Sequence, residues 1–269
     1  MHNHKKTLLG VGVKRGLEKF AAFSVWGLFA SLFFCIPGVV YADSVAISNI
    51  SFSNPQITAS AGTIVFADPW NTQAFAEAQN SLGEHDKHFD SHTGAPSKAT
   101  ATVSYAGATG KADVAPLDGA ASSYATLVPN DPIPEADSKG RGTLYNFFEI
   151  TGGTGSVDVT FSADIAGALL VATDDDGLLA QTETIFGLEL DGQPILFFDK
   201  LLSVGPDSFA SAAFGKTLST TTALNFDTPY FVLAQGDSES VAVLTPEPPT
   251  ALLLFSALLG AAACVGKKS

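Results

Sequence analysis

Three histidines that lie close together are the first candidates for chemistry in this chain. His85, His88 and His92 stand within eight residues of one another, among several carboxylates. Imidazole and carboxylate groups are ligands of transition metals such as zinc. The spacing i, i+3, i+7 would place the three rings on one face of a helix, but Gly83 and Gly94 flank the run, as in a polar loop. Two interpretations are open: a metal site formed by these histidines, or a solvated histidine-rich loop.

An acidic run is the second candidate. Asp174, Asp175 and Asp176 are contiguous and precede Gly177. A calcium loop spaces its acids alternately and ends on a distant glutamate. The run therefore indicates a tight turn after a strand, with weak calcium binding at its tip as the alternative. We expect no cofactor, and calcium and zinc are the two metals that these residues could take.

Aromatic residues are the third candidate, because their rings could stack on sugars. The residues of suitable type include Trp70, Tyr105, Tyr124 and Tyr145. Trp70 follows Asp68 and Pro69, in a turn where its ring could be exposed. It is the candidate ligand-binding residue, and burial in the core is the alternative.

Enzyme motifs do not stand out. The chain has no Gly-x-Ser-x-Gly elbow and no glycine loop of the kind that holds phosphate. Carboxylates are so numerous that spacing cannot single out a glycosidase pair. The two cysteines, Cys35 and Cys264, lie in apolar segments near the two ends, which excludes a cysteine nucleophile between them. We therefore expect a protein that is not an enzyme.

The elements that would carry these candidates are mostly strands. Residues 156–165 alternate between apolar and polar types, as in a half-buried antiparallel strand. Asp191 and Gly192 form a favoured hairpin turn between residues 184–190 and 193–198. Residues 230–234 and 238–244 resemble a final hairpin around positions 235–237. Further strands are expected at 45–52, 63–67, 101–106, 144–150, 168–172 and 218–226.

Two segments differ from this pattern. Residues 71–82 place Ala74, Phe75, Ala78 and Leu82 at helical spacing, which predicts one short helix. Residues 107–141 are rich in glycine and proline, which predicts a long loop with one short strand near 124–128. The fold class is therefore all-β: an antiparallel, jelly-roll-like β-sandwich with one short helix.

The last 24 residues have three parts. Pro246, Glu247 and Pro248 form a stretch that cannot join a helix or a central strand, because proline fixes φ and lacks a backbone donor. Thr250 follows, then an apolar run over 251–265 and two lysines before the final serine. The run is short for a spanning helix, which needs roughly 17–25 residues, and the snorkelling lysine stems could lengthen it.

This tail resembles the PEP-CTERM sorting signal of Gram-negative bacteria. The matching positions are Pro246, Glu247 and Pro248, with Thr250 at the family's usual serine or threonine position. The resemblance covers about a tenth of the chain. It implies processing by a membrane-embedded exosortase after transient anchoring by a C-terminal transmembrane helix. An ordinary single-span tail anchor is the alternative.

The N-terminal segment has the layout of a secretory signal. Five basic residues precede or border an apolar run over 20–36, and small residues around Ala42 predict cleavage between Ala42 and Asp43. An uncleaved anchor is the alternative. The expected organisation is thus a signal peptide at 1–42, an exported domain at 43–245 and a sorting signal at 246–269.

The charge of the exported part limits its partners. Residues 43–245 contain seven basic and 25 acidic residues, a net charge of about −18. Such acidity argues against nucleic acid as a partner and favours solubility. It could also attract cationic polymers or divalent cations.

The expected function follows from the two ends. Signal peptidase, the Sec machinery, exosortase and, transiently, the inner membrane are the expected partners. The resemblance implies a cell-surface or extracellular-matrix protein associated with exopolysaccharide and biofilm. The alternatives are a carbohydrate-binding module and, behind it, a secreted hydrolase.

Overall fold

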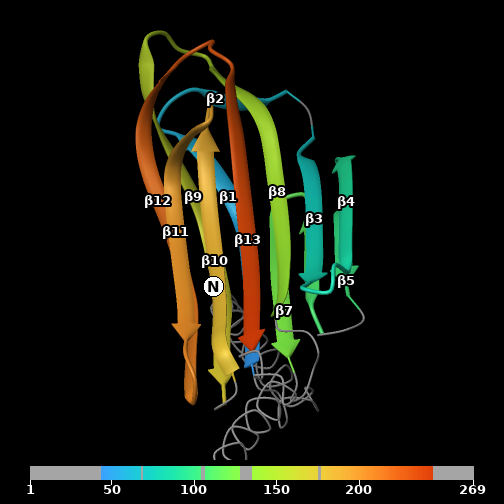
Figure 1. Cartoon of the computed structure of the whole chain (residues 1–269). Coiled ribbons are helices and arrows are strands. Elements are labelled where there is room, and N and C mark those ends of the chain that lie inside the picture. Colours follow the sequence, from blue (N-terminus) through green and yellow to red (C-terminus); the bar gives the residue numbers. More distant parts are fainter. Residues whose placement is uncertain (1–43, 68, 104–106, 128–134, 175–176, 245–269) are drawn as a thin grey trace, which may run out of the picture. The chain divides into compact units, whose positions relative to one another are not determined.

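A computed structural model of the chain describes residues 44–67, 69–103, 107–127, 135–174 and 177–244. These residues form 13 strands, and none of them is helical. The strands make two antiparallel sheets (Figure 1). The expected all-β class is confirmed.

The strand order in sheet A is β12–β9–β1–β7–β6–β5, and in sheet B it is β11–β10–β13–β8–β3–β4, with β2 paired to one end of β8. The bounds in sheet A are β1 (Ser44–Ala59), β5 (Ser97–Thr102), β6 (Thr109–Ala115), β7 (Asp118–Leu127), β9 (Ser156–Thr173) and β12 (Ser208–Asn225). The bounds in sheet B are β2 (Thr63–Phe66), β3 (Asn71–Asn80), β4 (His85–Thr93), β8 (Glu135–Thr151), β10 (Gly177–Leu190), β11 (Gln193–Val204) and β13 (Tyr230–Leu244).

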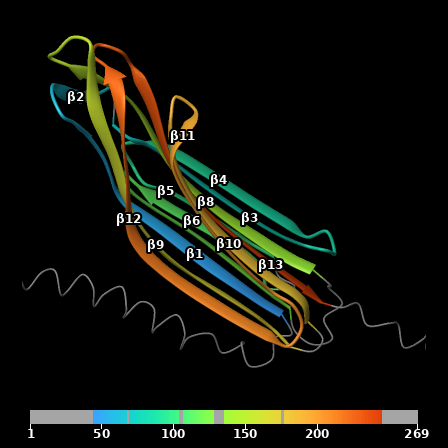
Figure 2. The same cartoon turned by 90° about the vertical axis from the view of Figure 1, so that its left-hand side faces the viewer.

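The sheets face each other across a main buried core and a small second cluster around Ala46, Val171 and Ala180, and each sheet has an outer face toward solvent (Figure 2). The largest fully buried side chains include Phe52 and Phe161 from sheet A and Phe186 from sheet B. The rings of Phe52 and Phe186 meet across the core with centres 5.5 Å apart. Each such side chain contributes about 2–3 kcal/mol through burial, so aromatic contacts between the sheets hold this part of the sandwich together.

A second part of the core is built from small residues. A Cβ atom added to Gly110 of β6 would stand 2.1 Å from the carbonyl oxygen of Lys139 on β8. A Cβ atom added to Gly140 of β8 would stand 2.2 Å from the carbonyl oxygen of Lys111 on β6. The two backbones therefore approach each other directly here, which only glycine permits.

Hydroxyl groups also join the sheets inside the core. The Ser48 Oγ of β1 lies 2.9 Å from the Ser123 Oγ of β7 and 2.6 Å from the Ser238 Oγ of β13. The Ser123 Oγ in turn lies 2.8 Å from the Ser240 Oγ. All four serines are buried. This network satisfies polar groups that would otherwise be costly to bury.

Both ends of the described chain lie at one end of the sandwich, called here the terminal end. The Ser44 Oγ at the start of β1 donates a hydrogen bond of 2.8 Å to the carbonyl oxygen of Leu179. Leu179 is paired in the sheet with Val243, next to the end of β13. The opposite end, where β1 finishes and β13 begins, is called the far end.

Two strand predictions are confirmed in detail. Residues 156–165 belong to β9, where Val157, Val159 and Phe161 face the core. Asp191 and Gly192 connect β10 to β11, with φ angles of 50° and 75°. Positive φ at both central positions is what the two-residue hairpin turn requires.

The helix predicted over residues 71–82 is wrong, because these residues form β3 and the turn after it. Thr72, Ala74, Ala76 and Ala78 alternate along the strand and are fully buried. The sequence did not reveal this strand periodicity, because Ala74 and Ala78 also have the i, i+4 spacing of one helix face. Packing between the sheets overrides the helical preference of alanine.

The loop predicted over residues 107–141 is also wrong in most of its length, since it contains β6, β7 and the start of β8. The hairpin predicted around residues 235–237 is wrong as well, because β13 runs unbroken through Gly236. A Cβ atom added to Gly236 would stand 3.0 Å from the Phe52 ring, and one added to Gly119 only 2.1 Å from it. These glycines make room inside the core and do not mark turns.

Candidate functional site

The three histidines lie on β4, an edge strand of sheet B, and not on a helix or in a loop. Alternation along a strand puts His88 and His92 on one face and His85 on the other. His85 Nε2 lies 2.7 Å from the Glu77 carboxylate, and His92 Nε2 lies 3.0 Å from that of Asp90. The polar loop expected for this run is therefore a strand, and the i, i+3, i+7 spacing does not bring the three imidazoles onto one face. In the part of the chain that the structure describes, no three potential metal ligands come together.

The acids beside these histidines connect the two sheets along one edge. The amide of Lys98 on β5 donates to Asp90 at 2.8 Å, and the amide of Thr102 donates to Asp86 at 2.9 Å. The hydrogen bond from Lys98 is the main cause that lowers the pKa of Asp90. β5 is the edge strand of sheet A, so these carboxylates cover backbone donors that would otherwise be open to another strand.

The acidic run lies between β9 and β10. Asp174 accepts a hydrogen bond of 3.2 Å from the amide of Gly177 through its side chain. Asp175 and Asp176 lie outside the described residues.

Trp70 is half-buried just before β3. Its ring packs against the core, and its centre lies 5.6 Å from that of Phe66. Of the other aromatic candidates, Tyr124 lies on the outer face of sheet A and Tyr145 on the outer face of sheet B, both half-buried. Tyr105 lies outside the described residues.

Tyr145 belongs to a group of aromatic side chains that sequence reasoning missed. Phe231 of β13 lies between Tyr145 and Phe147 of β8, with ring centres 6.0 Å and 5.1 Å away. Phe147 is 51% exposed, and the Tyr145 hydroxyl accepts a hydrogen bond of 3.4 Å from Gln73. We call Tyr145, Phe147 and Phe231 the aromatic zone. The signal for it was an aromatic residue at positions 145 and 147, which share one face of a strand.

Charged residues occupy the same outer face of sheet B toward the terminal end. Arg141 Nε lies 2.5 Å from the Asp237 carboxylate, and Lys139 Nζ lies 3.1 Å from that of Glu239. Burial, followed by repulsion from Asp199, raises the pKa of Glu183. Acids therefore outweigh bases here, and the local field is negative.

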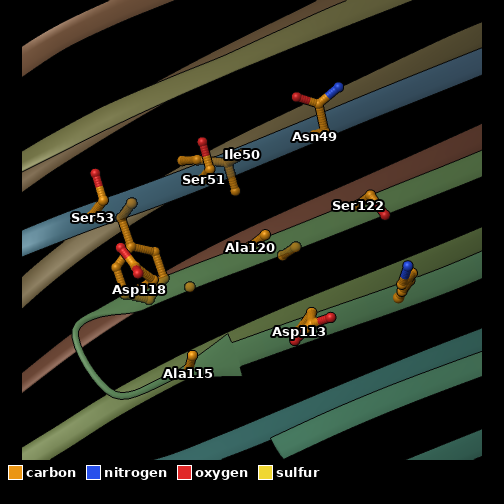
Figure 3. A pocket seen from close by; sticks show the side chains of 13 residues that line it. Asn49, Ile50, Ser51, Ser53, Asp113, Ala115, Asp118, Ala120 and Ser122 are labelled. Atoms are coloured by element: carbon orange, nitrogen blue, oxygen red, sulfur yellow. The ribbon is translucent and has the colours of Figure 1, made fainter. Parts of the chain in front are cut away.

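A shallow depression of about 490 Å³ lies on the outer face of sheet A, on the other side of the sandwich (Figure 3). Its floor includes Gly119 and Ala120 of β7, and its polar groups include Asn49, Ser51 and Asp118. Small side chains on neighbouring strands leave this hollow. Its lining presents hydroxyls, carboxylates and the Lys111 side chain, in contrast to the aromatic surface of sheet B.

The predicted processing sites lie outside the described residues. They are Ala42 and Asp43 at the signal cleavage site, and Pro246, Glu247, Pro248 and Thr250 in the sorting motif. Between residues 44 and 244, the described segments contain no helix that could cross a membrane.

Comparison with known proteins found no match. The chain matches no protein-family model, no curated protein and no solved structure.

Proposed function

We propose that the chain is an exported, non-catalytic protein of the cell surface or extracellular matrix, sorted by an exosortase in a Gram-negative envelope. The observation that carries this proposal is the position of the domain's two ends. Among the described residues, β1 begins at Ser44, two positions after Ala42, and β13 ends at Leu244, two positions before Pro246. Both lie at the terminal end of the sandwich.

This geometry suits a domain that is held at a membrane and then released. A chain that enters at Ser44 and leaves at Leu244 enters and leaves on one side, so an anchor before β1 and a spanning helix after β13 would tether the same end. The route uses the Sec machinery, signal peptidase and exosortase, and the folded part is a jelly-roll-like sandwich between a signal helix and a C-terminal transmembrane helix.

Mass spectrometry of the mature protein tests the sorting step. The chain is expressed in a host that contains an exosortase, and the C-terminal peptide of the exported form is identified. We expect a terminus near Pro246 in the parent, and a terminus at Ser269 when Glu247→Ala disrupts the motif. A parent protein that still ends in Lys268 and Ser269 would contradict the proposal. Turnover of a polysaccharide by the purified protein would contradict its non-catalytic part.

Carbohydrate binding is the second candidate function, and the aromatic zone is the observation that favours it. Exposed aromatic side chains on a soluble domain commonly mark binding surfaces. Pull-down on exopolysaccharide tests this function, with Phe147→Ala as the variant. We also compare Trp70→Ala, whose half-buried ring makes a change in binding less informative than a change at Phe147.

A further inference from the structure

The outer face of sheet B carries two different surfaces in line along β8 and β13. The aromatic zone lies toward the far end. An acidic zone lies toward the terminal end, in neighbouring rows of the sheet. Its acids are Glu77, Asp137, Glu183, Asp199, Asp237 and Glu239.

The aromatic zone can bind the apolar faces of sugar rings and also cations. The ring planes of Phe147 and Phe231 are tilted by 52°, and those of Tyr145 and Phe231 by 47°, so the three rings are not coplanar. A ligand cation placed over such a ring gains roughly 0.5–2 kcal/mol from the ring's quadrupole. The amide of Gln73, hydrogen-bonded to Tyr145, adds a polar group at the border.

The acidic zone is only partly neutralised. Lys139 and Arg141 pair with Glu239 and Asp237. Glu183 and Asp199 are instead diagonal neighbours on β10 and β11, since Glu183 pairs with Leu201 and Asp199 with Ile185, and their side chains share a hydrogen bond. No ion pair to either is found in the described segments. Repulsion from Asp199 contributes to the raised pKa of Glu183. A cation placed between these two groups would relieve that repulsion.

The two zones are separated by the length of an oligosaccharide. Along β13, Leu233, which pairs with Tyr145, and Asp237 are four residues apart, or about 13 Å at the usual rise of a strand. The outer members Phe231 and Glu239 are eight residues apart, or about 26 Å. The rows between them are mixed: Thr143 and Gln235 are polar, whereas Leu233, Ile185 and the exposed Phe197 are apolar. A chain molecule is needed to contact both zones, since a single sugar could contact only one.

We infer that the outer face of sheet B binds a polysaccharide of amino sugars with free ammonium groups. Sugar rings contact the aromatic zone, and ammonium groups pair with Glu183 and Asp199 in the acidic zone. The inference rests on the second proposed function and names its ligand class.

The negative charge of the acidic zone disfavours other ligands on this face. An anionic polysaccharide would place carboxylates against the acidic zone, which is unfavourable. A second copy of this chain carries the same excess of acids, about −18 over residues 43–245, so this face would repel it. A cationic glycan is complementary to both zones.

Calorimetry with three oligosaccharides of equal length tests the inference: an oligomer of glucosamine, one of N-acetylglucosamine and one of glucose joined as in cellulose. The full-length protein is used in a mild detergent at slightly acidic pH, where the glucosamine ammonium groups are charged. We expect the glucosamine oligomer to bind about tenfold or more tightly than the other two, a difference of about 1.4 kcal/mol. Its advantage should shrink as salt is added.

Matched variants assign the binding to this face. Phe147→Ala and Phe231→Ala should weaken all binding, whereas Phe209→Ala should not. Phe209 is 65% exposed but lies on β12 in sheet A, so it controls for the loss of an exposed ring. The double change Glu183→Gln and Asp199→Asn should remove the preference for glucosamine and leave the binding of the neutral oligomers intact. Circular dichroism confirms that each variant is folded.

The possible results distinguish a preference for ammonium groups from carbohydrate binding in general. Equal binding of all three oligomers would support carbohydrate binding and overturn the preference for ammonium groups. Glucosamine binding that survives the double change would also overturn the assignment to Glu183 and Asp199. If no oligomer binds, both the inference and carbohydrate binding fail, and the sorting proposal is still decided by the mature C-terminus.

Discussion

Lys216 points into the sandwich from edge strand β12, and its Nζ lies 4.2 Å from the centre of the Phe198 ring on edge strand β11. It shares the inner face of β12 with Phe214 and Leu218, which pack against the core. An inward-pointing charge on an edge strand keeps another strand from extending the sheet. Lys216 therefore protects an edge of 18 residues that contains no other charged residue.

We predict that Lys216→Leu makes the protein self-associate. The substitution leaves an apolar inner face next to unpaired backbone groups, and a second β12 can then pair with them. Light scattering should show a mass that rises with protein concentration. Lys111→Leu is the control, because Lys111 is exposed on β6, which is paired on both sides by β5 and β7 and is not an edge strand. Equal masses for both variants would show that Lys216 has no such role.

Sequence patterns predicted the strands whose two faces differ in polarity. Residues 156–165 alternate between valine or phenylalanine and polar groups, and this pattern survives in β9. Prediction from sequence patterns failed where the core is made of alanine and glycine. Alanine at positions 74, 76 and 78 does not distinguish a strand from a helix, and glycine at positions 110, 119 and 236 resembled turns.

The candidate site was less accessible to sequence reasoning than the fold. Tyr145 was among the aromatic candidates, but Phe231 lies far from it in the chain. Only the register of β8 against β13, which pairs Phe147 with Phe231, brings the rings together. A single sequence does not specify which strands become neighbours, so the aromatic zone could not be predicted from it.

Gly110→Ala should destabilise the protein by about 3 kcal/mol or more, because overpacking with no room to relax is costly. The added methyl group would meet the carbonyl oxygens of Lys139 and Glu77 at 2.1 Å and 2.5 Å, and both are backbone atoms. Urea unfolding measures the loss. Gly187→Ala is the control, since no heavy atom lies within 4 Å of the position of its Cβ. A Gly110→Ala protein as stable as the Gly187→Ala protein would contradict the close approach of β6 and β8.

Two threonines of β10 should respond in opposite ways to valine. The Thr184 Oγ1 is buried and has no hydrogen-bond partner among the described residues. The Thr182 Oγ1 donates to the carbonyl oxygen of Glu239 at 2.8 Å and lies 2.8 Å from the Ser240 Oγ. Thr184→Val should therefore stabilise the protein by about 1 kcal/mol, and Thr182→Val should destabilise it by about 1–2 kcal/mol. Denaturant unfolding of both variants checks the pair, and a loss of stability in Thr184→Val would show that its hydroxyl is satisfied.

Zinc should leave the melting temperature unchanged. A ligand raises the stability of the folded state only if it binds that state preferentially. His85 lies on the opposite face of β4 from His88 and His92, so the three rings cannot close around one ion. Calorimetric scans with and without excess zinc provide the measurement. A rise that disappears in His88→Ala and His92→Ala would show that a site forms at this edge after all.

Asp137→Asn should stabilise the protein at neutral pH. Burial, followed by repulsion from Glu239 and Glu77, raises the pKa of Asp137 in the folded state. The folded protein therefore binds more protons than the unfolded chain between the unfolded pKa, about 3.8, and the raised folded value. Stability must fall as pH rises through this window. Asparagine removes the charge and keeps an oxygen to accept the hydrogen bond from Gln79.

Urea unfolding at a series of pH values tests this effect. The advantage of Asp137→Asn over the parent should be full above the folded pKa and should vanish below the unfolded one. Asp158→Asn is the control, because Asp158 is exposed on the outer face of sheet A. If both variants gained stability equally, the cause would be the excess negative charge of the whole domain. A gain confined to Asp137→Asn would instead locate the repulsion on the outer face of sheet B, where the acidic zone crowds its carboxylates.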